Sequence, residues 1–124
     1  MQFSDIAAIV TGGASGLGGA TASALAARGA KVFGLDLSAS IESAESADGV
    51  TLVSADVTSE EQVRSAVEQA AGVAPLRIVV NCAGVGSAGR ILSKNGPHDL
   101  ALFRRCWTST SSARSMCCGS EPRR

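Results

Sequence analysis

The chain has 124 residues, with 11 basic and 11 acidic side chains and therefore no formal net charge at pH 7. This length suits one domain and is too short for two, and the balanced charge gives no indication of a nucleic-acid or anionic-membrane partner. No apolar run is long enough to cross a bilayer, and residues 1–5 lack the basic and apolar segments of a signal peptide, so we expect a cytoplasmic protein.

Four short apolar runs predict the strands of a buried sheet. They are residues 5–11, 30–36, 50–55 and 76–81. Helical segments are predicted between them, at residues 15–28, 38–47 and 59–72. Alternation of strand and helix is typical of an α/β fold, so we expect a parallel sheet with flanking helices and right-handed crossovers.

Local signals define the predicted helices. In the first, Leu17 and Leu25 are available to face the sheet, and Gly29 follows as a C-cap. The second is weak and rich in Ser and Glu. In the third, Ser59 and Gln62 have the spacing of a capping box.

The composition changes after residue 84. Residues 85–97 predict a loop and residues 98–105 the start of a helix, whereas residues 106–124 contain no Val, Ile or Leu. Such a segment can bury little apolar area, so we expect an irregular or disordered tail. We therefore divide the chain into a folded unit, residues 1–105, and a tail, residues 106–124.

The cysteines do not have the spacing of a metal site. Cys106, Cys117 and Cys118 lie in the tail, and no CxxC pair or histidine partner accompanies them. Cys82 ends an apolar run and is predicted to be a buried structural thiol. We expect no metal.

A glycine-rich loop, Thr11–Gly18 (TGGASGLG), lies between the first predicted strand and helix. Glycine lets the backbone turn tightly and approach a phosphate, and the free N–H groups of a helix N-terminus favour an anion. A strand–helix turn alone would explain the glycines, but Asp36 ends the next strand, where an acid reaches the adenosine ribose hydroxyls. The pattern therefore predicts the N-terminal half of a Rossmann-type fold that binds a dinucleotide.

The same acid distinguishes two dinucleotides. A carboxylate at Asp36 accepts a hydrogen bond from a ribose 2′-OH and repels a 2′-phosphate. Neither Leu37 nor Ser15 offers a cation to such a phosphate. We therefore expect NAD rather than NADP.

Several motifs resemble those of short-chain dehydrogenases/reductases. The loop has their TGxxxGxG spacing, and Asp36 matches their NAD-selecting acid. Ala55–Thr58 (ADVT) is similar to their adenine-contacting motif, and Asn81–Gly84 (NCAG) to their NNAG motif with Cys in second place. Together with NGPHDLALFRR at residues 95–105, these motifs are similar to the type-2 3-hydroxyacyl-CoA dehydrogenase branch. The resemblance covers residues 1–105.

The resemblance and the loop chemistry imply a set of cofactor-binding residues. They are Gly12, Ser15, Gly16, Leu17 and Gly18 at the pyrophosphate, Asp36 at the ribose, Asp56 and Val57 at the adenine, and Asn81, Cys82, Ala83 and Gly84 along the cofactor.

The resemblance implies an NAD-dependent oxidation of a secondary alcohol, such as a 3-hydroxyacyl-CoA, in a homo-oligomeric parent protein. Family members use a Ser and a Tyr-x-x-x-Lys motif for this reaction. The chain has no tyrosine, its only lysines are Lys31 and Lys94, and His98 is not a credible replacement. We therefore expect no catalytic residue here.

Two functions stay open: a fragment of such an oxidoreductase without catalysis, or a non-catalytic dinucleotide-binding or interaction module. A methyltransferase-like nucleotide site fits the glycine spacing and NCAG less well.

The tail also permits a second interpretation at the level of its codons. Read one base out of phase from Arg105, the codons of Cys106–Trp107 and of Cys117–Cys118 each contain a leucine codon, and Trp107–Thr108 contains GAC, for aspartate. Allowed codon choices give VLDVNLIGTFNVLRL, which resembles the continuation of the family after FRR. We therefore expect that a frameshift near Arg105 truncated the family sequence. The alternative is a natural Ser-rich tail whose codons happen to permit this frame.

Overall fold

A computed structural model describes residues 2–45, 47–86 and 92–117 and contains a four-stranded parallel sheet. In chain order, the elements are β1 (Ala7–Thr11), α1 (Gly16–Ala27), β2 (Lys31–Asp36), α2 (Ser38–Glu42), β3 (Val50–Ser54), α3 (Glu60–Val73), β4 (Leu76–Asn81), β5 (Leu92–Ser93), β6 (Gly96–Pro97) and α4 (Leu100–Cys117). The strand order is β3-β2-β1-β4, which places β1 between β2 and β4. The predicted parallel α/β fold is confirmed, and each predicted strand lies within two residues of its expected bounds.

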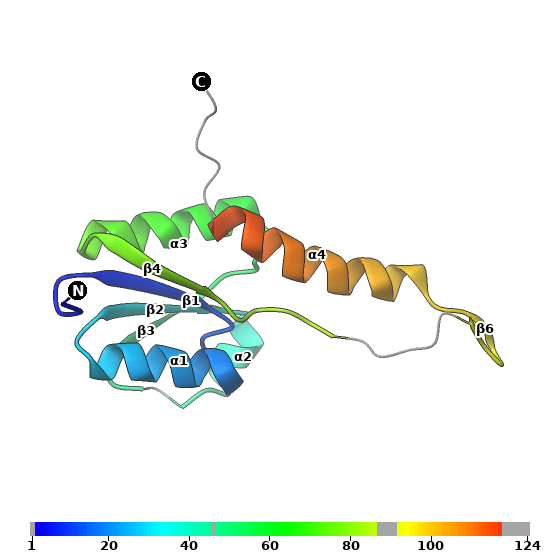
Figure 1. Cartoon of the computed structure of the whole chain (residues 1–124), viewed down its shortest axis with the longest axis horizontal. Coiled ribbons are helices and arrows are strands. Elements are labelled where there is room, and N and C mark those ends of the chain that lie inside the picture. Colours follow the sequence, from blue (N-terminus) through cyan, green and yellow to red (C-terminus); the bar gives the residue numbers. More distant parts are fainter. Residues whose placement is uncertain (1, 46, 87–91, 118–124) are drawn as a thin grey trace, which may run out of the picture.

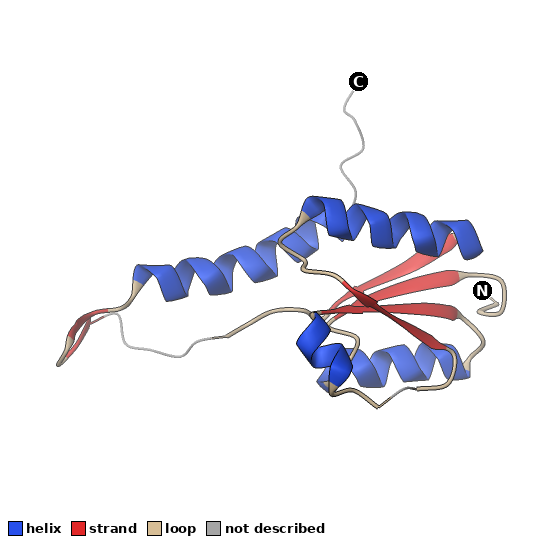
Figure 2. Cartoon of the chain, turned by 180° about the vertical axis from the view of Figure 1, so that it is seen from behind, coloured by secondary structure: helices blue, strands red, loops and turns tan. Residues whose placement is uncertain are grey.

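Helices cover both faces of this sheet (Figures 1 and 2): α1 and α2 lie on one face and α3 on the other. A strand that is buried on both faces does not alternate apolar and polar residues in its sequence. This explains why β1 is apolar up to its last residue, Thr11, since all five of its residues are buried.

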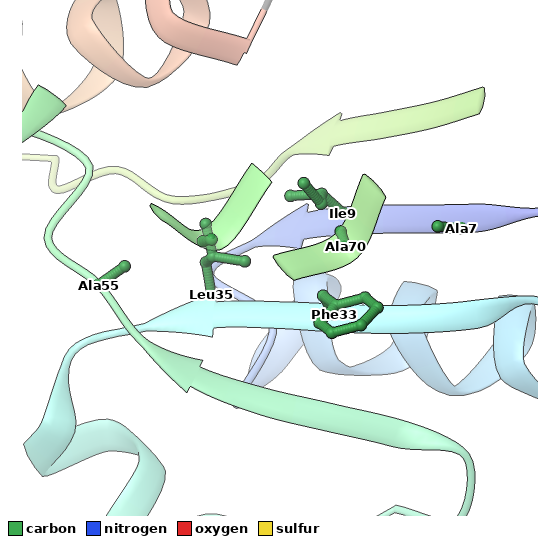
Figure 3. Close-up of a cluster of buried hydrophobic side chains, with 7 residues drawn as sticks. Ala7, Ile9, Phe33, Leu35, Ala55 and Ala70 are labelled. Atoms are coloured by element: carbon green, nitrogen blue, oxygen red, sulfur yellow. The ribbon is translucent and has the colours of Figure 1, made fainter. Parts of the chain in front are cut away.

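Two apolar clusters hold the three layers together. On the α3 face (Figure 3), the buried residues are Ala7, Ile9, Phe33, Leu35, Ala55, Ala66 and Ala70. On the α1 face, they are Ile6, Ala8, Val10, Ala22, Ala30 and Val32. Full burial of each large aliphatic side chain contributes about 1.5–3 kcal/mol, and the many alanines let both helices lie close to the strands.

The end of α1 has the predicted glycine cap. Gly29 has a φ of +95°, its N–H donates to the Ala26 carbonyl at 2.8 Å, and the Ala30 N–H donates to the Leu25 carbonyl at 3.2 Å. This pair of bonds is a Schellman motif. Leu25 packs against the core as expected, but Leu17 is 84% exposed, so its predicted contact with the sheet is wrong.

The start of α3 differs from the predicted capping box. Ser59 is the N-cap residue, but its side chain makes no capping hydrogen bond. The Gln62 side-chain oxygen instead accepts from the N–H of Asp56 at 2.8 Å. The turn before α3 brings that N–H within reach, so Gln62 ties the helix to the residue that follows β3.

The last described segment is more regular than its composition predicts. The expected loop at residues 85–97 contains the short antiparallel pair β5–β6, and residues 106–117, expected to be irregular, continue helix α4. Asp99 begins this helix, because its carboxylate accepts from the Ala101 N–H at 2.8 Å. Ser and Thr have only modestly lower helix propensity than Leu, so a capped turn propagates through them. Residues 87–91 and 118–124 lie outside the described residues.

Helix α4 contacts β4 and α3, and it carries several exposed apolar side chains, Leu100, Phe103 and Trp107 among them. Of the helices in the described ranges, none is long and apolar enough to span a membrane.

A pair of glycine substitutions should test the packing between the loop and the sheet. A Cβ atom at Gly13 would lie 2.6 Å from the Gly34 Cα and 2.8 Å from the Val10 carbonyl oxygen. Because both neighbours are backbone atoms, Gly13→Ala should lower the free energy of unfolding by about 1–3 kcal/mol.

Gly72, in α3, is the matched control, because nothing lies within 4 Å of the position its Cβ would occupy. Gly72→Ala should raise stability by about 0.5–1 kcal/mol. Thermal denaturation followed by circular dichroism measures both variants, and equal melting temperatures for the two would contradict this account of the packing.

Candidate functional site

A cleft of about 800 Å³ opens at the carboxyl end of the sheet, where β1, β2, β3 and β4 end and α4 passes by. Ligands of open α/β sheets bind at this edge. The cleft brings together all of the predicted site residues except one: Gly12, Ser15, Gly16, Leu17, Gly18, Asp36, Asp56, Val57, Cys82, Ala83 and Gly84. The exception is Asn81, the last residue of β4, which is paired with Thr11 across the sheet. The role of the predicted site residues in binding a ligand stays a prediction.

The glycine loop is folded tightly against its surroundings. Gly12 and Gly16 have positive φ values of +69° and +58°, which favour glycine. A Cβ atom at Gly18 would lie 2.1 Å from the Gly12 carbonyl oxygen, so the loop and the first turn of α1 touch through bare backbone. A side chain at Gly18 would therefore force the first turn of α1 away from the loop.

The hydrogen bonds of the loop determine which N–H groups face the cleft. The N–H groups of Gly12 and Gly13 both donate to the Leu35 carbonyl, at 2.7 and 3.2 Å. The first intrahelical bond of α1 runs from Gly19 to Ser15, and Ser15 makes no side-chain cap. Within the described part of the chain, the three N–H groups of residues 16–18 have no acceptor, so they are the donors available to an anion.

Asp36, at the end of β2, has a carboxylate that is held in place by the backbone. One oxygen accepts from the Ala14 N–H at 3.1 Å and the other from the Leu37 N–H at 2.9 Å. Each carboxylate oxygen can accept more than one hydrogen bond. The carboxylate is therefore fixed beside the glycine loop and can still accept from hydroxyl groups of a ligand.

Asp56 lies two residues after the end of β3 and lines the cleft. Its carboxylate accepts from the Thr58 hydroxyl at 2.6 Å and from the Thr58 N–H at 2.8 Å. These two bonds, the hydroxyl first, lower the pKa of Asp56 below its usual 3.8. Asp56 is therefore an ionised acceptor at neutral pH, with its second oxygen left for a ligand.

Thr11 holds two walls of the cleft together, a role that the sequence reasoning missed. Its side chain is fully buried, and its hydroxyl oxygen accepts from the N–H groups of Cys82 and Ala83 at 3.2 and 3.1 Å. The signal was present, since a hydroxyl residue ends an otherwise apolar buried strand, where a neighbouring backbone needs an acceptor.

Cys82 is exposed in the cleft, so the prediction of a buried structural thiol is wrong. Burial was inferred from the apolar run of β4, but Cys82 lies beyond the end of that strand. Leu17 is likewise exposed because it occupies the first turn of α1, on the side that faces the cleft rather than the sheet.

Helix α4 forms a wall that the sequence reasoning did not place in the site. Arg104, Arg105, Thr108 and Ser109 line the cleft. The Ser109 hydroxyl accepts from the Val85 N–H at 3.3 Å, which ties the helix to the segment after β4. The loop before α4 carries no motif that would have predicted this contact.

Comparison with known proteins identifies the relationship of the chain. A family model described as short chain dehydrogenase matches residues 6–107. The chain belongs to this family. Short-chain dehydrogenases are oxidoreductases. The residues that the family model matches include the carboxyl ends of all four strands, β1 to β4, which form one edge of the cleft.

Individual relatives are similar over most of this chain. The 3-hydroxyacyl-CoA dehydrogenases type-2 of Drosophila melanogaster and Homo sapiens are 44% identical over 103 residues and 40% identical over 106 residues, which are 78% and 81% of this chain. The structure of 3-hydroxyacyl-CoA dehydrogenase type-2 from Mycobacterium avium is 33% identical, with a TM-score of 0.74 over 98% of this chain and 53% of that one. A short-chain type dehydrogenase/reductase from Mycobacterium ulcerans gives a TM-score of 0.77 at 27% identity, over 94% of this chain and 46% of that one.

The chain spans only part of these relatives. It covers 40% and 41% of the length of the Drosophila and human proteins. The likeness therefore establishes the family and the fold of this part.

The Thr11 hydroxyl gives a direct test of how the cleft walls are joined. Thr11→Val keeps the side-chain shape but leaves the Ala83 N–H without its acceptor, which should lower the free energy of unfolding by about 1–3 kcal/mol. Thr11→Ser keeps the hydroxyl and is the matched control. Urea denaturation measures both, and a Val variant more stable than the Ser variant would contradict the proposed contact.

Proposed function

We propose that this chain is the cofactor-binding part of an oxidoreductase and that its cleft binds NAD in preference to NADP. The observation that carries the proposal is the convergence of the glycine loop, the Asp36 carboxylate and the Asp56 carboxylate on one cleft. Its volume of about 800 Å³ suits a ligand of cofactor size.

The residues of the cleft match the chemistry of a dinucleotide. The free N–H groups of residues 16–18 at the start of α1 would face the pyrophosphate, with the helix dipole adding to the attraction. Asp36 would accept hydrogen bonds from the adenosine ribose, and Asp56 from the adenine amino group. Ala83, which lies beside Gly12, and Gly84 would lie along the cofactor. When bound, the nicotinamide ring supplies the hydride acceptor.

Discrimination between the two dinucleotides rests on Asp36. Its carboxylate favours a 2′-OH and repels a 2′-phosphate, and Leu37 beside it carries no compensating cation. We infer a preference for NAD of about tenfold or more, a difference in binding free energy of about 1.4 kcal/mol.

The substrate proposal comes from the relatives, which are named for 3-hydroxyacyl-CoA. We propose that the whole protein oxidises a secondary alcohol of this class, in the cytoplasm, as a homo-oligomer. The 124 residues contain no tyrosine. Tyrosine is the residue type that serves as the general acid/base in short-chain dehydrogenases. We therefore propose that they bind cofactor without turning over substrate.

A second candidate is a non-catalytic dinucleotide-binding or interaction module. It is favoured by the outer edge of β4, which pairs with no strand in the described part of the chain and carries the partly exposed Val79. An open, apolar strand edge is a template for pairing with another chain. A soluble complex with a complete relative that binds NAD without turnover would favour this candidate.

The cofactor proposal is tested by titrating the 124-residue chain with NAD and with NADP in a calorimeter. The wild type should bind NAD more tightly, and Asp36→Asn should remove most of the preference by weakening NAD and relieving the repulsion of NADP. Asp48→Asn is the control for charge, because Asp48 is exposed and does not line the cleft. Equal affinities of the wild type for the two dinucleotides would contradict the proposal, and NADH formation from a 3-hydroxyacyl-CoA would contradict the absence of turnover.

We also propose that residues 106–124 are translated out of phase with the family sequence. The match to the family model ends at residue 107, which supports this. Sequencing the gene and its transcript across the codon of Arg105 tests it: restoration of a frame that encodes VNLIG is the expected result. A transcript that encodes residues 106–124 as printed, with no alternative frame resembling the family, would contradict it.

A further inference from the structure

We propose that Arg104 and Arg105 of α4 form a second anion-binding wall, which holds the pyrophosphate of the bound dinucleotide from the side opposite the glycine loop. This inference rests on the proposed function. It assigns the two arginines as binding residues in addition to the loop and to Asp36.

The glycine loop leaves an anion with few partners. Three of its N–H groups are already used, since Gly12 and Gly13 donate to the Leu35 carbonyl and Ala14 donates to the Asp36 carboxylate. The first turn of α1 contains no charged side chain. The donors that remain include the N–H groups of residues 16–18, whose partial charge is smaller than that of a pyrophosphate.

The charges of the cleft make the two arginines the complement of such an anion. Among the residues that line it, Arg104 and Arg105 are the basic ones and Asp36 and Asp56 the acidic ones. In the described ranges neither arginine lies within ion-pair distance of a carboxylate. The arginines and the carboxylates of the cleft therefore do not neutralise each other. A ligand that carries hydroxyl donors at one end and phosphates beside them would pair with both.

The seating of α4 places the two arginines in the same cleft as the glycine loop. Gly12 lies against Ala83, and the segment that follows is tied to α4 where the Ser109 hydroxyl accepts from the Val85 N–H. Residues four apart lie on one face of a helix. Arg105 therefore shares the face of Ser109, and Arg104 that of Thr108, and all four line the cleft. A guanidinium presents five N–H donors and pairs well with phosphate oxygens.

The proposal is tested with two probes on the full 124-residue chain: ADP, which carries the pyrophosphate, and adenosine, which does not. Calorimetry measures ADP, and ligand-detected NMR measures adenosine. R104Q/R105Q should weaken ADP binding about tenfold, flatten its dependence on salt concentration, and leave adenosine binding unchanged. R104K/R105K keeps both charges and should retain most of the affinity for ADP.

Arg77→Gln is the matched control, because Arg77 is an exposed arginine on β4 that does not line the cleft. Circular dichroism melting of every variant separates loss of binding from loss of fold. Unchanged ADP affinity in R104Q/R105Q, or an equal loss for ADP and adenosine in a folded variant, would overturn the second anion wall while leaving the proposed function intact. A wild-type chain that binds neither probe would overturn the proposed function, and this inference with it.

Discussion

The cleft depends on close contact between pieces of bare backbone around the loop after β1. Gly13 lies against Gly34 of β2, Gly18 against Gly12, and Gly12 against Ala83. No side chain separates these segments, so their spacing is set by van der Waals contact and has little freedom to vary. Because β1 is an inner strand that lies between β2 and β4, a shift at its end would move the groups contributed by both of its neighbours.

The positions of the polar groups in the site follow from the spacing of these backbone segments. The Asp36 carboxylate reaches the loop because β2 ends beside it, and the Thr11 hydroxyl reaches the backbone after β4 because that strand ends on the other side. Each polar group is thus fixed by the backbone of a different segment. The cleft is consequently preorganised before any ligand arrives, and ordering it costs little binding free energy.

The sequence predicted what depends on local pattern and missed what depends on packing between segments. Apolar runs placed the four strands, and the glycine spacing with Asp36 placed the polar edge of the sheet. The exposure of Cys82 and the partner of Gln62 are set by how neighbouring segments end and turn, which no residue pattern encodes. The continuation of helix α4 beyond residue 105 was missed for another reason: composition measures how much apolar area a segment can bury, whereas a capped helix also forms by propagation along its own backbone.

The parallel arrangement, with β1 in the middle, also has a consequence for synthesis on the ribosome. β1 leaves the ribosome first and β4 last, and the hydrogen bond from the Cys82 N–H, just after β4, to the Thr11 hydroxyl spans 71 residues of sequence. Domains generally fold as units, and contacts of long sequence separation are slow to form. The strand that completes the cleft is therefore the last of the four to emerge, so a nascent chain can form the whole cleft only after all four strands have left the ribosome.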